Sequence, residues 1–552
     1  MWVTVFVNIP LPQSFTYSVP EEFKNDVVVG KRVQVLFRNR KSIAFVTEVL
    51  DTLPPELPFD KNLIKPIQKV TDTEILFTKE QIELSLWMEK FYLCSRGEAL
   101  SAMLPSGKRE TDFGGFSFEE DSVEFAPRNL SEDQKAAIDS IIHNKNTNNQ
   151  FHYLYGSTGS GKTEVFLQVA ESLLAEGKGV IYLVPEIGLT HQVIEAVIRR
   201  FGQTTAVLHS GLTGSQKLTE WHRILKREAR IVIGARSGVF APVPDLGLII
   251  IDEEHDASYK AGNSPRYSAR QVAMKRCQNL HIPLLMGSAT PSVEAWKMMK
   301  DGLINKQVLT QRLAGGTTPD IEIVNLANEK NRAEGTGCIS HRLEEEIRET
   351  HDRGRQTILF LNRRGFTHFF RCNSCGHELL CKNCSVALTY HRSENRLRCH
   401  YCGWSIQPPK ECPECGSLDT GYAGFGTEFI ENEVKAKFLG YKIERIDSDV
   451  VTNKNELQDR LEAFKKGEID ILLGTQMVAK GLNFPNLQLV GVVLADTGLS
   501  MPDFRASERT FSLLVQVAGR AGRFFPDGKV IIQTFNPYRS AISFASKSYF
   551  LS

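Results

Sequence analysis

The hydrophobic pattern changes first from strand-like to helix-like near the start of the chain. Between residue 1 and about residue 70, apolar and polar side chains alternate in short runs bounded by turn residues, as in Val3-Thr4-Val5-Phe6-Val7. Alternation with a period of two is typical of antiparallel strands that bury one face. Apolar residues then recur at helical spacing across residues 78–104. We therefore expect residues 1–105 to form a small β-rich domain with a helical extension.

From residue 130 onward, continuous apolar runs alternate with amphipathic stretches. One such run is Leu248-Ile249-Ile250-Ile251, and comparable runs return after residue 356. Apolar strands separated by helices are typical of a parallel sheet that is covered on both faces. The pattern predicts an α/β fold with two lobes. We expect the first lobe at residues 130–310, the second at residues 311–370 and 417–540, a cysteine-rich insert at residues 371–416, a linker at residues 106–129, and the start of a further domain at residues 541–552.

Composition excludes some classes of protein and leaves others open. The chain has 66 basic and 65 acidic side chains, so any nucleic-acid contact must come from local patches rather than from overall charge. Residues 1–10 lack the features of a signal peptide, and no apolar run approaches the roughly 20 residues of a membrane span. We expect a cytoplasmic protein without a membrane partner, in which the 11 cysteines stay reduced.

A phosphate-binding loop follows the apolar run His152-Tyr153-Leu154-Tyr155. The loop matches the Walker A pattern at every position: Gly156, Ser157, Thr158, Gly159, Ser160, Gly161, Lys162 and Thr163. Glycines let backbone N–H groups approach phosphate oxygens, and the start of the following helix adds positive potential. We expect Lys162 to reach the β- and γ-phosphates of ATP and the Thr163 hydroxyl to bind Mg²⁺.

Two acidic residues, Asp252 and Glu253, follow the apolar run of residues 248–251. Ligands of open α/β sheets bind beyond the carboxyl ends of the strands, so acids at this place suit a Mg²⁺ site. We predict that Asp252 holds Mg²⁺, directly or through water, and that Glu253 is the base that orients the attacking water. The alternative is a solvated acidic turn, which the phosphate-binding loop upstream argues against.

Eight of the 11 cysteines form four C-x-x-C pairs within residues 371–416. Two such pairs make a tetrahedral Cys₄ zinc site, so four pairs predict two structural zinc ions without an open coordination position. Counting alone leaves the pairing ambiguous, and the spacing favours a nested arrangement. The outer set comprises Cys372, Cys375, Cys412 and Cys415, and the inner set comprises Cys381, Cys384, Cys399 and Cys402. An iron–sulfur cluster is the alternative.

Further motifs extend the series in a recognisable order. Gln134 lies upstream of the phosphate-binding loop, where an amide can bond both a donor and an acceptor on an adenine edge. Gly287-Ser288-Ala289-Thr290 follows the acidic residues, and residues 516–523 carry an arginine-rich motif near the end of the second lobe. This order resembles that of superfamily 2 helicases. The resemblance implies two RecA-like motor lobes, with Arg520 and Arg523 facing the γ-phosphate so that hydrolysis is coupled to lobe motion.

Longer stretches narrow the resemblance to the PriA family of bacterial replication-restart helicases. They include the cysteine block placed after Phe360-Leu361-Asn362-Arg363-Arg364-Gly365, and Asp503-Phe504-Arg505-Ala506-Ser507-Glu508-Arg509. The resemblance implies an ATP-dependent 3′→5′ DNA helicase that recognises stalled forks and D-loops and unwinds the lagging arm to restart replication. The implied partners are forked and single-stranded DNA, single-stranded-DNA-binding protein, and the primosome proteins that reload the replicative helicase.

The resemblance also implies that the N-terminal domain captures the 3′ end of a nascent DNA strand. The matching pocket motif is Leu11-Pro12-Gln13-Ser14-Phe15-Thr16-Tyr17, with Lys65 as a basic pocket residue. A well-studied form of the motif has an aspartate at the position of Thr16. The Thr16 hydroxyl can still form a hydrogen bond with a 3′-hydroxyl, but without the assistance of a negative charge. We expect Phe15, Thr16, Tyr17 and Lys65 to bind DNA. The alternative for Phe15 and Tyr17 is ordinary packing in the core of the β domain.

Residues 259–267 form a loop with two tyrosines and two basic side chains directly after the acidic motif. In the PriA family such a loop couples DNA contact to hydrolysis. We expect Tyr259, Arg266 and Tyr267 to bind DNA by base stacking and phosphate contact, together with Arg236 from the same lobe. An exposed loop without such a role is the alternative.

Two departures from the family pattern lead to further expectations. Residues 106–129 are too few for the winged-helix module of the family, and the chain ends at Ser552, soon after the second lobe. We expect a reduced or truncated form, in which the binding of duplex DNA and partners is weakened if those modules are absent. Two other functions stay open: a scaffold that loads partners at forks with little use of its ATPase, and an RNA helicase.

Overall fold

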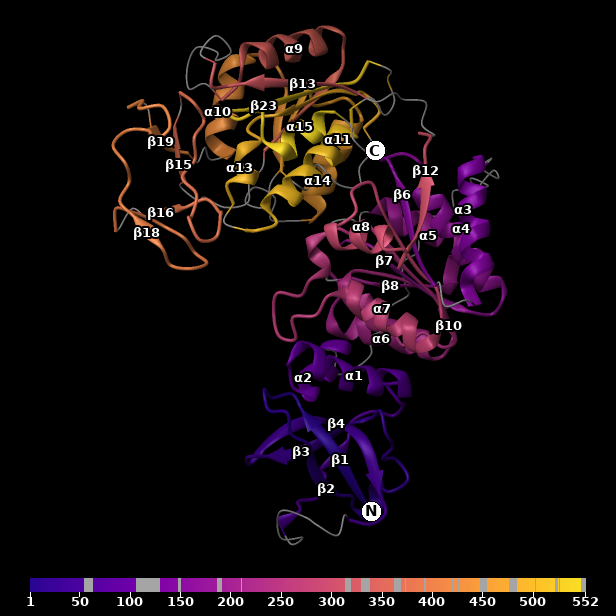
Figure 1. Cartoon of the computed structure of the whole chain (residues 1–552). Coiled ribbons are helices and arrows are strands. Elements are labelled where there is room, and N and C mark those ends of the chain that lie inside the picture. Colours follow the sequence, from indigo (N-terminus) through magenta and orange to yellow (C-terminus); the bar gives the residue numbers. More distant parts are fainter. Residues whose placement is uncertain are drawn as a thin grey trace. The chain divides into compact units, whose positions relative to one another are not determined.

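The computed structural model describes most of the chain. Not described are residues 54–62, 106–129, 147–149, 186–190, 210, 313–318, 329–337, 362–368, 373, 392–393, 419, 424–426, 447–453, 476–483, 502, 522–524, 526 and 548–552. The chain forms two compact units, of which the first comprises residues 1–155 and 162–308 and the second comprises residues 156–161 and 309–552. Figure 1 shows the elements of both units.

The N-terminal domain is built on a five-stranded antiparallel sheet in the order β2-β1-β4-β3-β5 (Figure 1). Its strands are β1 (Trp2–Val7), β2 (Phe15–Ser18), β3 (Arg32–Phe37), β4 (Arg40–Leu50) and β5 (Lys69–Val70), with a 3₁₀ helix η1 (Glu21–Phe23) after β2. The alternation in the sequence places one face in the core, because Val3, Val5 and Val7 are buried whereas Thr4 and Phe6 are only partly so. The predicted β domain is confirmed.

Two helices follow this sheet, α1 (Lys79–Tyr92) and α2 (Arg96–Met103). Each begins with a capping box, formed by Thr78 with Gln81 and by Ser95 with Glu98. Helix α2 approaches β1 so closely that a Cβ at Gly97 would lie 1.9 Å from the carbonyl oxygen of Val7. Only glycine fits at this contact, and the absence of a side chain there lets the helix pack closely against the sheet.

Helix α1 is joined to the first lobe by buried polar contacts. The Gln81 side-chain amide donates to the carbonyl oxygen of Phe240 at 2.7 Å, and the Arg276 guanidinium pairs with Glu80 at 2.9 Å. Arg276 also donates to the carbonyl oxygen of Val239, so this nearly inaccessible cation is both paired and hydrogen-bonded. The β domain, its helices and the first lobe therefore belong to one compact unit.

The first lobe is a seven-stranded sheet in the order β12-β6-β11-β10-β7-β9-β8. Its strands are β6 (Phe151–Gly156), β7 (Gly179–Leu183), β8 (Thr205–Leu208), β9 (Ile231–Gly234), β10 (Leu246–Asp252), β11 (Leu284–Ser288) and β12 (Asn305–Leu309). Its helices are α3 (Glu132–His143), α4 (Lys162–Ala175), α5 (His191–Phe201), α6 (Gly214–Leu225), α7 (Ala269–Leu280) and α8 (Val293–Lys300), with the 3₁₀ helices η3 (Asn144–Asn146), η5 (Gly202–Thr204), η6 (Arg236–Phe240) and η7 (Ala257–Tyr259). The strands from β6 to β8 in this order pair in parallel, as the continuous apolar runs predict.

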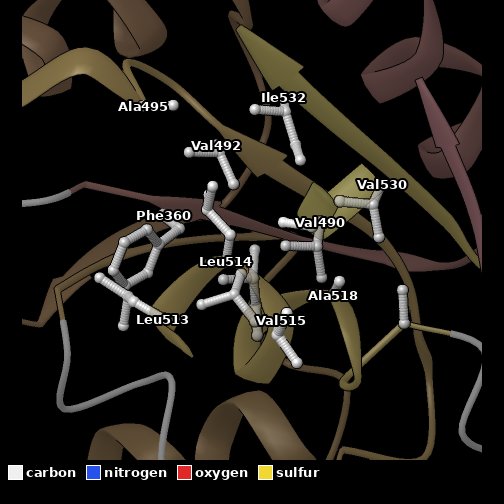
Figure 2. Packing of buried hydrophobic residues seen from close by; sticks show 14 of the residues in the cluster. Phe360, Val490, Val492, Ala495, Leu513, Leu514, Val515, Ala518, Val530 and Ile532 are labelled. Atoms are coloured by element: carbon white, nitrogen blue, oxygen red, sulfur yellow. The ribbon is translucent and has the colours of Figure 1, made fainter. Parts of the chain in front are cut away.

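The second lobe repeats this design with a six-stranded parallel sheet in the order β13-β23-β22-β14-β21-β20. Its strands are β13 (Asp320–Asn325), β14 (Gln356–Phe360), β20 (Ile443–Ile446), β21 (Ile471–Gly474), β22 (Leu487–Val492) and β23 (Lys529–Thr534). Its helices are α9 (His341–Asp352), α10 (Thr427–Lys437), α11 (Lys454–Lys465), α13 (Asp496–Leu499), α14 (Ala506–Ala518) and α15 (Ser540–Ser546). Figure 2 shows α14 covering the sheet, with Leu514 and Val515 packed toward Val490 of β22.

The cysteine-rich insert is a small antiparallel sheet between β14 and α10. Its strands are β15 (Phe369–Cys372), β16 (Thr389–His391), β17 (Arg396–Arg398), β18 (Ser405–Ile406) and β19 (Thr420–Ala423), in the order β18-β17-β16-β15-β19. Buried Glu378 joins the insert to the lobe, because its carboxylate accepts hydrogen bonds from Ser500 Oγ at 2.6 Å and from Arg539 at 2.9 Å. The predicted fold class, two parallel-sheet lobes with an N-terminal β domain and a cysteine-rich insert, is confirmed. None of the described helices has the length and apolar character that a bilayer crossing requires.

One buried histidine predicts how the first unit responds to acid. His152 of β6 is inaccessible to solvent, and neither of its ring nitrogens has a hydrogen-bond partner among the described residues. Burial lowers the pKa of His152 from 6.5 to about 4. The unfolded chain therefore binds a proton at this position as the pH falls below about 6.5, whereas the folded chain does not, so stability decreases with falling pH.

We expect the parent to lose roughly 1 kcal/mol of stability at this site between pH 7.5 and pH 5.5, and His152→Leu to abolish that loss. Thermal unfolding of both proteins at the two pH values measures the difference. The matched control is His143→Gln, which alters an exposed histidine and should keep the acid sensitivity of the parent. An equal loss in His152→Leu and in the parent would contradict the prediction.

Candidate functional site

The phosphate-binding loop connects the end of β6 to the start of α4, whose first residue is Lys162. Gly159 and Gly161 have φ angles of +85° and +81°, in the left-handed region that other residues rarely adopt. The first turn of α4 has N–H groups without intrahelical partners and the positive end of the helix dipole. The loop therefore has the local geometry that phosphate binding requires, and nucleotide contact by residues 156–163 stays a prediction.

Asp252 ends β10, between the neighbouring strands β7 and β11. Its two carboxylate oxygens accept hydrogen bonds from different elements. Oδ1 accepts from the backbone N–H of Glu253 at 2.9 Å, and Oδ2 accepts from the Tyr182 hydroxyl at 3.2 Å. Thr163 is the second residue of α4, the helix that follows the phosphate-binding loop. The Tyr182 phenol thus orients the carboxylate that the sequence assigns to Mg²⁺.

The charges around Asp252 fit a bound cation. Burial, together with the neighbouring Glu253 carboxylate, raises the pKa of the Asp252 carboxyl to about 7, and the Lys162 ammonium opposes this rise. Two adjacent carboxylates with one lysine leave negative charge in a poorly solvated place. Carboxylate and hydroxyl oxygens, here from Asp252 and Thr163, are the ligands that Mg²⁺ prefers. The residues present therefore fit a Mg²⁺ ion.

Glu253 lies beside the end of β11, in a left-handed backbone conformation with φ of +46°. Such conformations in residues other than glycine are enriched at functional sites. Its Oε2 accepts a hydrogen bond from Ser288 Oγ at 3.0 Å, and the same Oγ lies 2.7 Å from His255 Nδ1. The Glu253 side chain is 34% exposed. It is thus oriented by protein on one side and accessible to water on the other, which suits a residue that positions a water molecule.

Sequence reasoning missed the residues that hold Glu254, the residue after the two predicted acidic residues. The Glu254 side chain is fully buried, where it accepts hydrogen bonds from the Tyr153 hydroxyl at 3.2 Å and from the Ser292 N–H at 3.1 Å, and it pairs with Arg270. Tyr153 and Tyr182 each place a hydroxyl within an apolar strand, a signal that could have identified them. Arg270 and Ser292 carry no comparable signal, because only the fold brings them to Glu254.

Gln134 is nearly inaccessible and has a structural role at the start of α3. Its Oε1 accepts a hydrogen bond from the Ser131 N–H at 2.9 Å, and the Ser131 hydroxyl accepts one from the Gln134 N–H at 3.3 Å. The Ser-x-x-Gln spacing is the sequence signature of this capping box, so the role could have been predicted. The adenine contact of Gln134 stays a prediction.

The two arginines of the last motif follow α14 in the second lobe. Arg520 lies in the turn after α14, where its N–H donates to the carbonyl oxygen of Val517 at 3.1 Å. Arg523 lies outside the described residues. Their approach to the γ-phosphate stays a prediction.

The eight cysteines of the insert gather into two groups of four, within each of which the Sγ atoms lie within 4.8 Å of one another. The groups are Cys372, Cys375, Cys412 and Cys415, and Cys381, Cys384, Cys399 and Cys402. The Sγ atoms of Cys372 and Cys415 are 3.6 Å apart, and those of Cys381 and Cys402 are 3.5 Å apart. Four thiolates at about 2.3 Å from a zinc ion lie about 3.8 Å from one another. The nested pairing is confirmed, and both groups suit tetrahedral zinc.

The aromatic residues of the predicted DNA pocket differ in burial. Tyr17 points into the core of the β domain, where its hydroxyl donates to the carbonyl oxygen of Leu36 at 3.2 Å. Phe15 is half-buried and packs edge-on against Phe37 with ring centroids 4.9 Å apart. Core packing therefore accounts for Tyr17, whereas Phe15 retains an accessible part.

Thr16 and Lys65 lie at partly exposed and exposed positions of the same domain. Thr16 is directed to the face of β2 opposite Tyr17, because side chains alternate along a strand. Lys65 lies beside the end of β2, where its carbonyl oxygen accepts a hydrogen bond from the Ser18 N–H at 3.0 Å. Its ammonium donates to Asn39 Oδ1 at 3.2 Å. Both side chains remain available for a ligand, and their contact with DNA stays a prediction.

The two tyrosines of the loop at residues 259–267 are buried, which does not support base stacking by their rings in this structure. The Tyr259 hydroxyl donates to the carbonyl oxygen of Asp252 at 2.7 Å, and Tyr267 is only 5% exposed. The loop folds back onto the lobe, so these rings pack inward. The exposed side chains of the loop include the cations Lys260 and Arg266.

Arg236 and the helices after the β domain hold this loop. The Arg236 guanidinium donates to the carbonyl oxygens of Ser258 at 3.1 Å and Lys260 at 3.0 Å. The Lys260 ammonium lies 5.5 Å from the ring centre of Tyr92 in α1, and Ser264 Oγ donates to Glu98 of α2 at 3.0 Å. The loop is therefore supported from two sides, and Arg236 has a structural role beside its predicted contact with DNA.

The fold and the site define a helicase-type motor protein. Four family models match the chain: "3'DNA-binding domain (3'BD)" at residues 4–105, "DEAD/DEAH box helicase" at residues 131–299, "PriA DNA helicase Cys-rich region (CRR) domain" at residues 381–406, and "Helicase conserved C-terminal domain" at residues 424–525.

Curated relatives narrow the class to one family. The "Replication restart protein PriA" of Treponema pallidum is 49% identical over 541 residues, which cover 98% of this chain and 81% of the relative. The protein of the same name from Haemophilus influenzae is 36% identical and covers 97% and 82%, and that of Bacillus subtilis is 44% identical and covers 75% and 52%. The chain belongs to the PriA family of replication restart proteins, which confirms the resemblance inferred from its motifs.

Removal of one cysteine group should remove one metal ion. We expect the parent to bind two zinc ions, one for each group of four cysteines, and the double variant Cys381→Ser/Cys384→Ser to bind one. Cys277→Ala changes a buried cysteine outside the insert and should keep both ions. Elemental analysis by plasma mass spectrometry measures the metal content. Iron in the parent, or unchanged zinc in the double variant, would contradict the prediction.

Proposed function

We propose that this chain is an ATP-dependent 3′→5′ DNA helicase that recognises stalled forks and D-loops and unwinds the lagging arm to restart replication. The observation that best supports the proposal is the convergence of Lys162 and Thr163, at the start of α4 after β6, with Asp252, at the end of β10, at one edge of a parallel sheet. This convergence occurs in a chain that belongs to the PriA family and matches two helicase models.

Each residue of the proposed nucleotide site has a separate role in ATP hydrolysis. The loop of residues 156–161 and Lys162 bind the phosphates. Mg²⁺ held by Thr163 and Asp252 supplies neutralisation of the phosphate charge when it is bound. Glu253, oriented by the Ser288 hydroxyl, accepts a hydrogen bond from the attacking water and takes its proton.

Contact with DNA acts on the same residues through the loop of residues 259–267. Arg266 binds a phosphate of single-stranded DNA, and the exposed Lys260 adds positive charge beside it. Tyr259 transmits movement of the loop, because its hydroxyl is bonded to the backbone of Asp252. In the second lobe, Arg520 and Arg523 complete the nucleotide site when the lobes close, which couples hydrolysis to translocation.

Fork recognition uses the N-terminal domain, which matches a 3′ DNA-binding domain model. Phe15, Thr16 and Lys65 contact the 3′ end of the nascent leading strand. The Thr16 hydroxyl bonds the terminal 3′-hydroxyl without charge assistance, which predicts modest end specificity. Single-stranded-DNA-binding protein and primosome proteins act with the chain in the cytoplasm.

ATP hydrolysis on matched DNA substrates tests the proposal. We expect a fork with a nascent 3′-hydroxyl at the branch to stimulate hydrolysis more than a fork with a blocked 3′ end, and more than a matched RNA. Lys162→Ala should lower the stimulated rate by about 100-fold or more, because the transition-state charge on the γ-phosphate loses its clamp. Lys65→Ala should reduce the preference for the free 3′ end and leave stimulation by linear single-stranded DNA intact.

Two outcomes would count against the proposal. Stimulation by RNA as strong as by DNA would favour an RNA helicase. If Lys162→Ala supports restart in a reconstituted loading reaction as efficiently as the parent does, the result would favour a scaffold that does not use its ATPase.

Zinc should matter more for unwinding than for hydrolysis. All residues assigned to ATP lie outside the insert, whereas the insert joins the second lobe through Glu378. We expect chelation of zinc to reduce strand separation several-fold more than DNA-stimulated ATP hydrolysis, measured on the same fork with the same protein preparation. Glu378→Gln, which removes the charge that pairs with Arg539, should weaken unwinding in the same direction. An equal loss of strand separation and ATP hydrolysis on chelation would refute the prediction that zinc matters more for unwinding.

A further inference from the structure

Tyr182 is a hydroxyl-bearing side chain within the apolar strand β7. Its neighbours Ile181 and Leu183 are inaccessible to solvent, as is Tyr182 itself. A buried hydroxyl needs a hydrogen-bond partner, so an apolar residue would be the simpler choice for packing alone. The partner of this phenol is Asp252 Oδ2, at the end of the neighbouring strand β10.

The geometry around Tyr182 fixes the direction of its hydroxyl. The ring packs edge-on against Phe166 of α4, with centroids 5.9 Å apart and an interplanar angle of 72°. Parallel pairing sets Tyr182 beside Ile250 of β10, two residues before Asp252. The ring therefore lies two residues before the carboxyl end of β10, and the phenol oxygen lies 3.2 Å from Asp252 Oδ2.

We propose that Tyr182 is a positioning residue for the Mg²⁺ site, because its hydroxyl orients the carboxylate of the predicted ligand Asp252. This inference rests on the proposed nucleotide site. Partners of this kind fix the orientation of metal ligands, and their loss typically weakens metal affinity by about 10- to 100-fold. Tyr182 contacts the predicted ligand rather than the reacting atoms, so its role is positioning and not catalytic.

The other contacts of Asp252 explain why this one bond matters. Oδ1 is held by the backbone N–H of Glu253, and the backbone carbonyl of Asp252 is held by the Tyr259 hydroxyl. The hydrogen bond from Tyr182 is the side-chain contact that the structure describes on Oδ2. Without the Tyr182 hydroxyl, this carboxylate oxygen would lack its orienting partner among the described residues.

Tyr182→Phe tests the inference because it keeps the ring and removes only the hydroxyl. Binding of a fluorescent ATP analogue is measured with and without Mg²⁺, and the gain in affinity on adding Mg²⁺ is compared between proteins. We expect that gain to fall by about 10-fold in Tyr182→Phe, with metal-free binding close to that of the parent. The Mg²⁺ concentration that half-saturates ATP hydrolysis should rise by a similar factor, with little change in the rate at saturating Mg²⁺.

The matched control is Tyr153→Phe, which removes an equally buried hydroxyl from β6 that bonds Glu254 instead of Asp252. Its Mg²⁺-dependent gain should equal that of the parent even if its melting temperature is lower. Thermal unfolding of both variants reports any loss of stability. This comparison separates a general cost of deleting a buried hydroxyl from an effect on the metal ligands.

Three results would overturn the inference. The first is a Mg²⁺-dependent gain in Tyr182→Phe that equals the gain of the parent. The second is a loss in Tyr182→Phe that Tyr153→Phe reproduces, because the hydroxyl would then act through stability. The third is a parent that binds the analogue no more tightly with Mg²⁺ than without it. That last result would remove the proposed nucleotide site as well, whereas the first two would leave it intact.

Discussion

The proposed nucleotide site depends on the parallel register of the buried strands β6, β11, β10 and β7. Asp252 of β10 pairs with Gly287 of β11, which in turn pairs with Leu154 of β6. This register brings the phosphate-binding loop, Ser288 and the acidic motif to one edge of the sheet. A register shift would expose apolar side chains that are inaccessible on both faces, so the packing of the core sets the spacing of the chemical groups.

The carboxylates of Asp252 and Glu254 are accommodated in the first lobe by different contacts. Asp252 keeps its place through bonds from Tyr182, Tyr259 and the following N–H, and Glu254 is neutralised by Arg270. Asp252 has no such cationic partner at hydrogen-bond distance among the described residues, and burial together with the neighbouring Glu253 carboxylate raises its pKa. A carboxylate in this setting favours a bound cation.

The insert reaches a defined structure by a different route. Its core is small, with Phe370, Leu388 and Leu397 among its few large apolar side chains. Small modules of this kind bury too little apolar surface to be stable without metals or disulfides. The nested cysteine groups draw together the two ends and the middle of the segment. Glu378 then connects this separately stabilised module to the second lobe through Ser500 and Arg539.

The sequence by itself determined the parallel lobes, the Walker A pattern, the position of Asp252 and the four C-x-x-C pairs, whose nested grouping it favoured. Each depends on local spacing or on a strand end, which short-range rules describe. Only the tertiary structure decided that Tyr259 and Tyr267 face inward, that Arg270 neutralises Glu254, and that the Tyr182 hydroxyl bonds Asp252. The physical reason is that burial and hydrogen-bond partners depend on which elements pack together, and contacts between residues distant in sequence leave no periodic pattern along the chain.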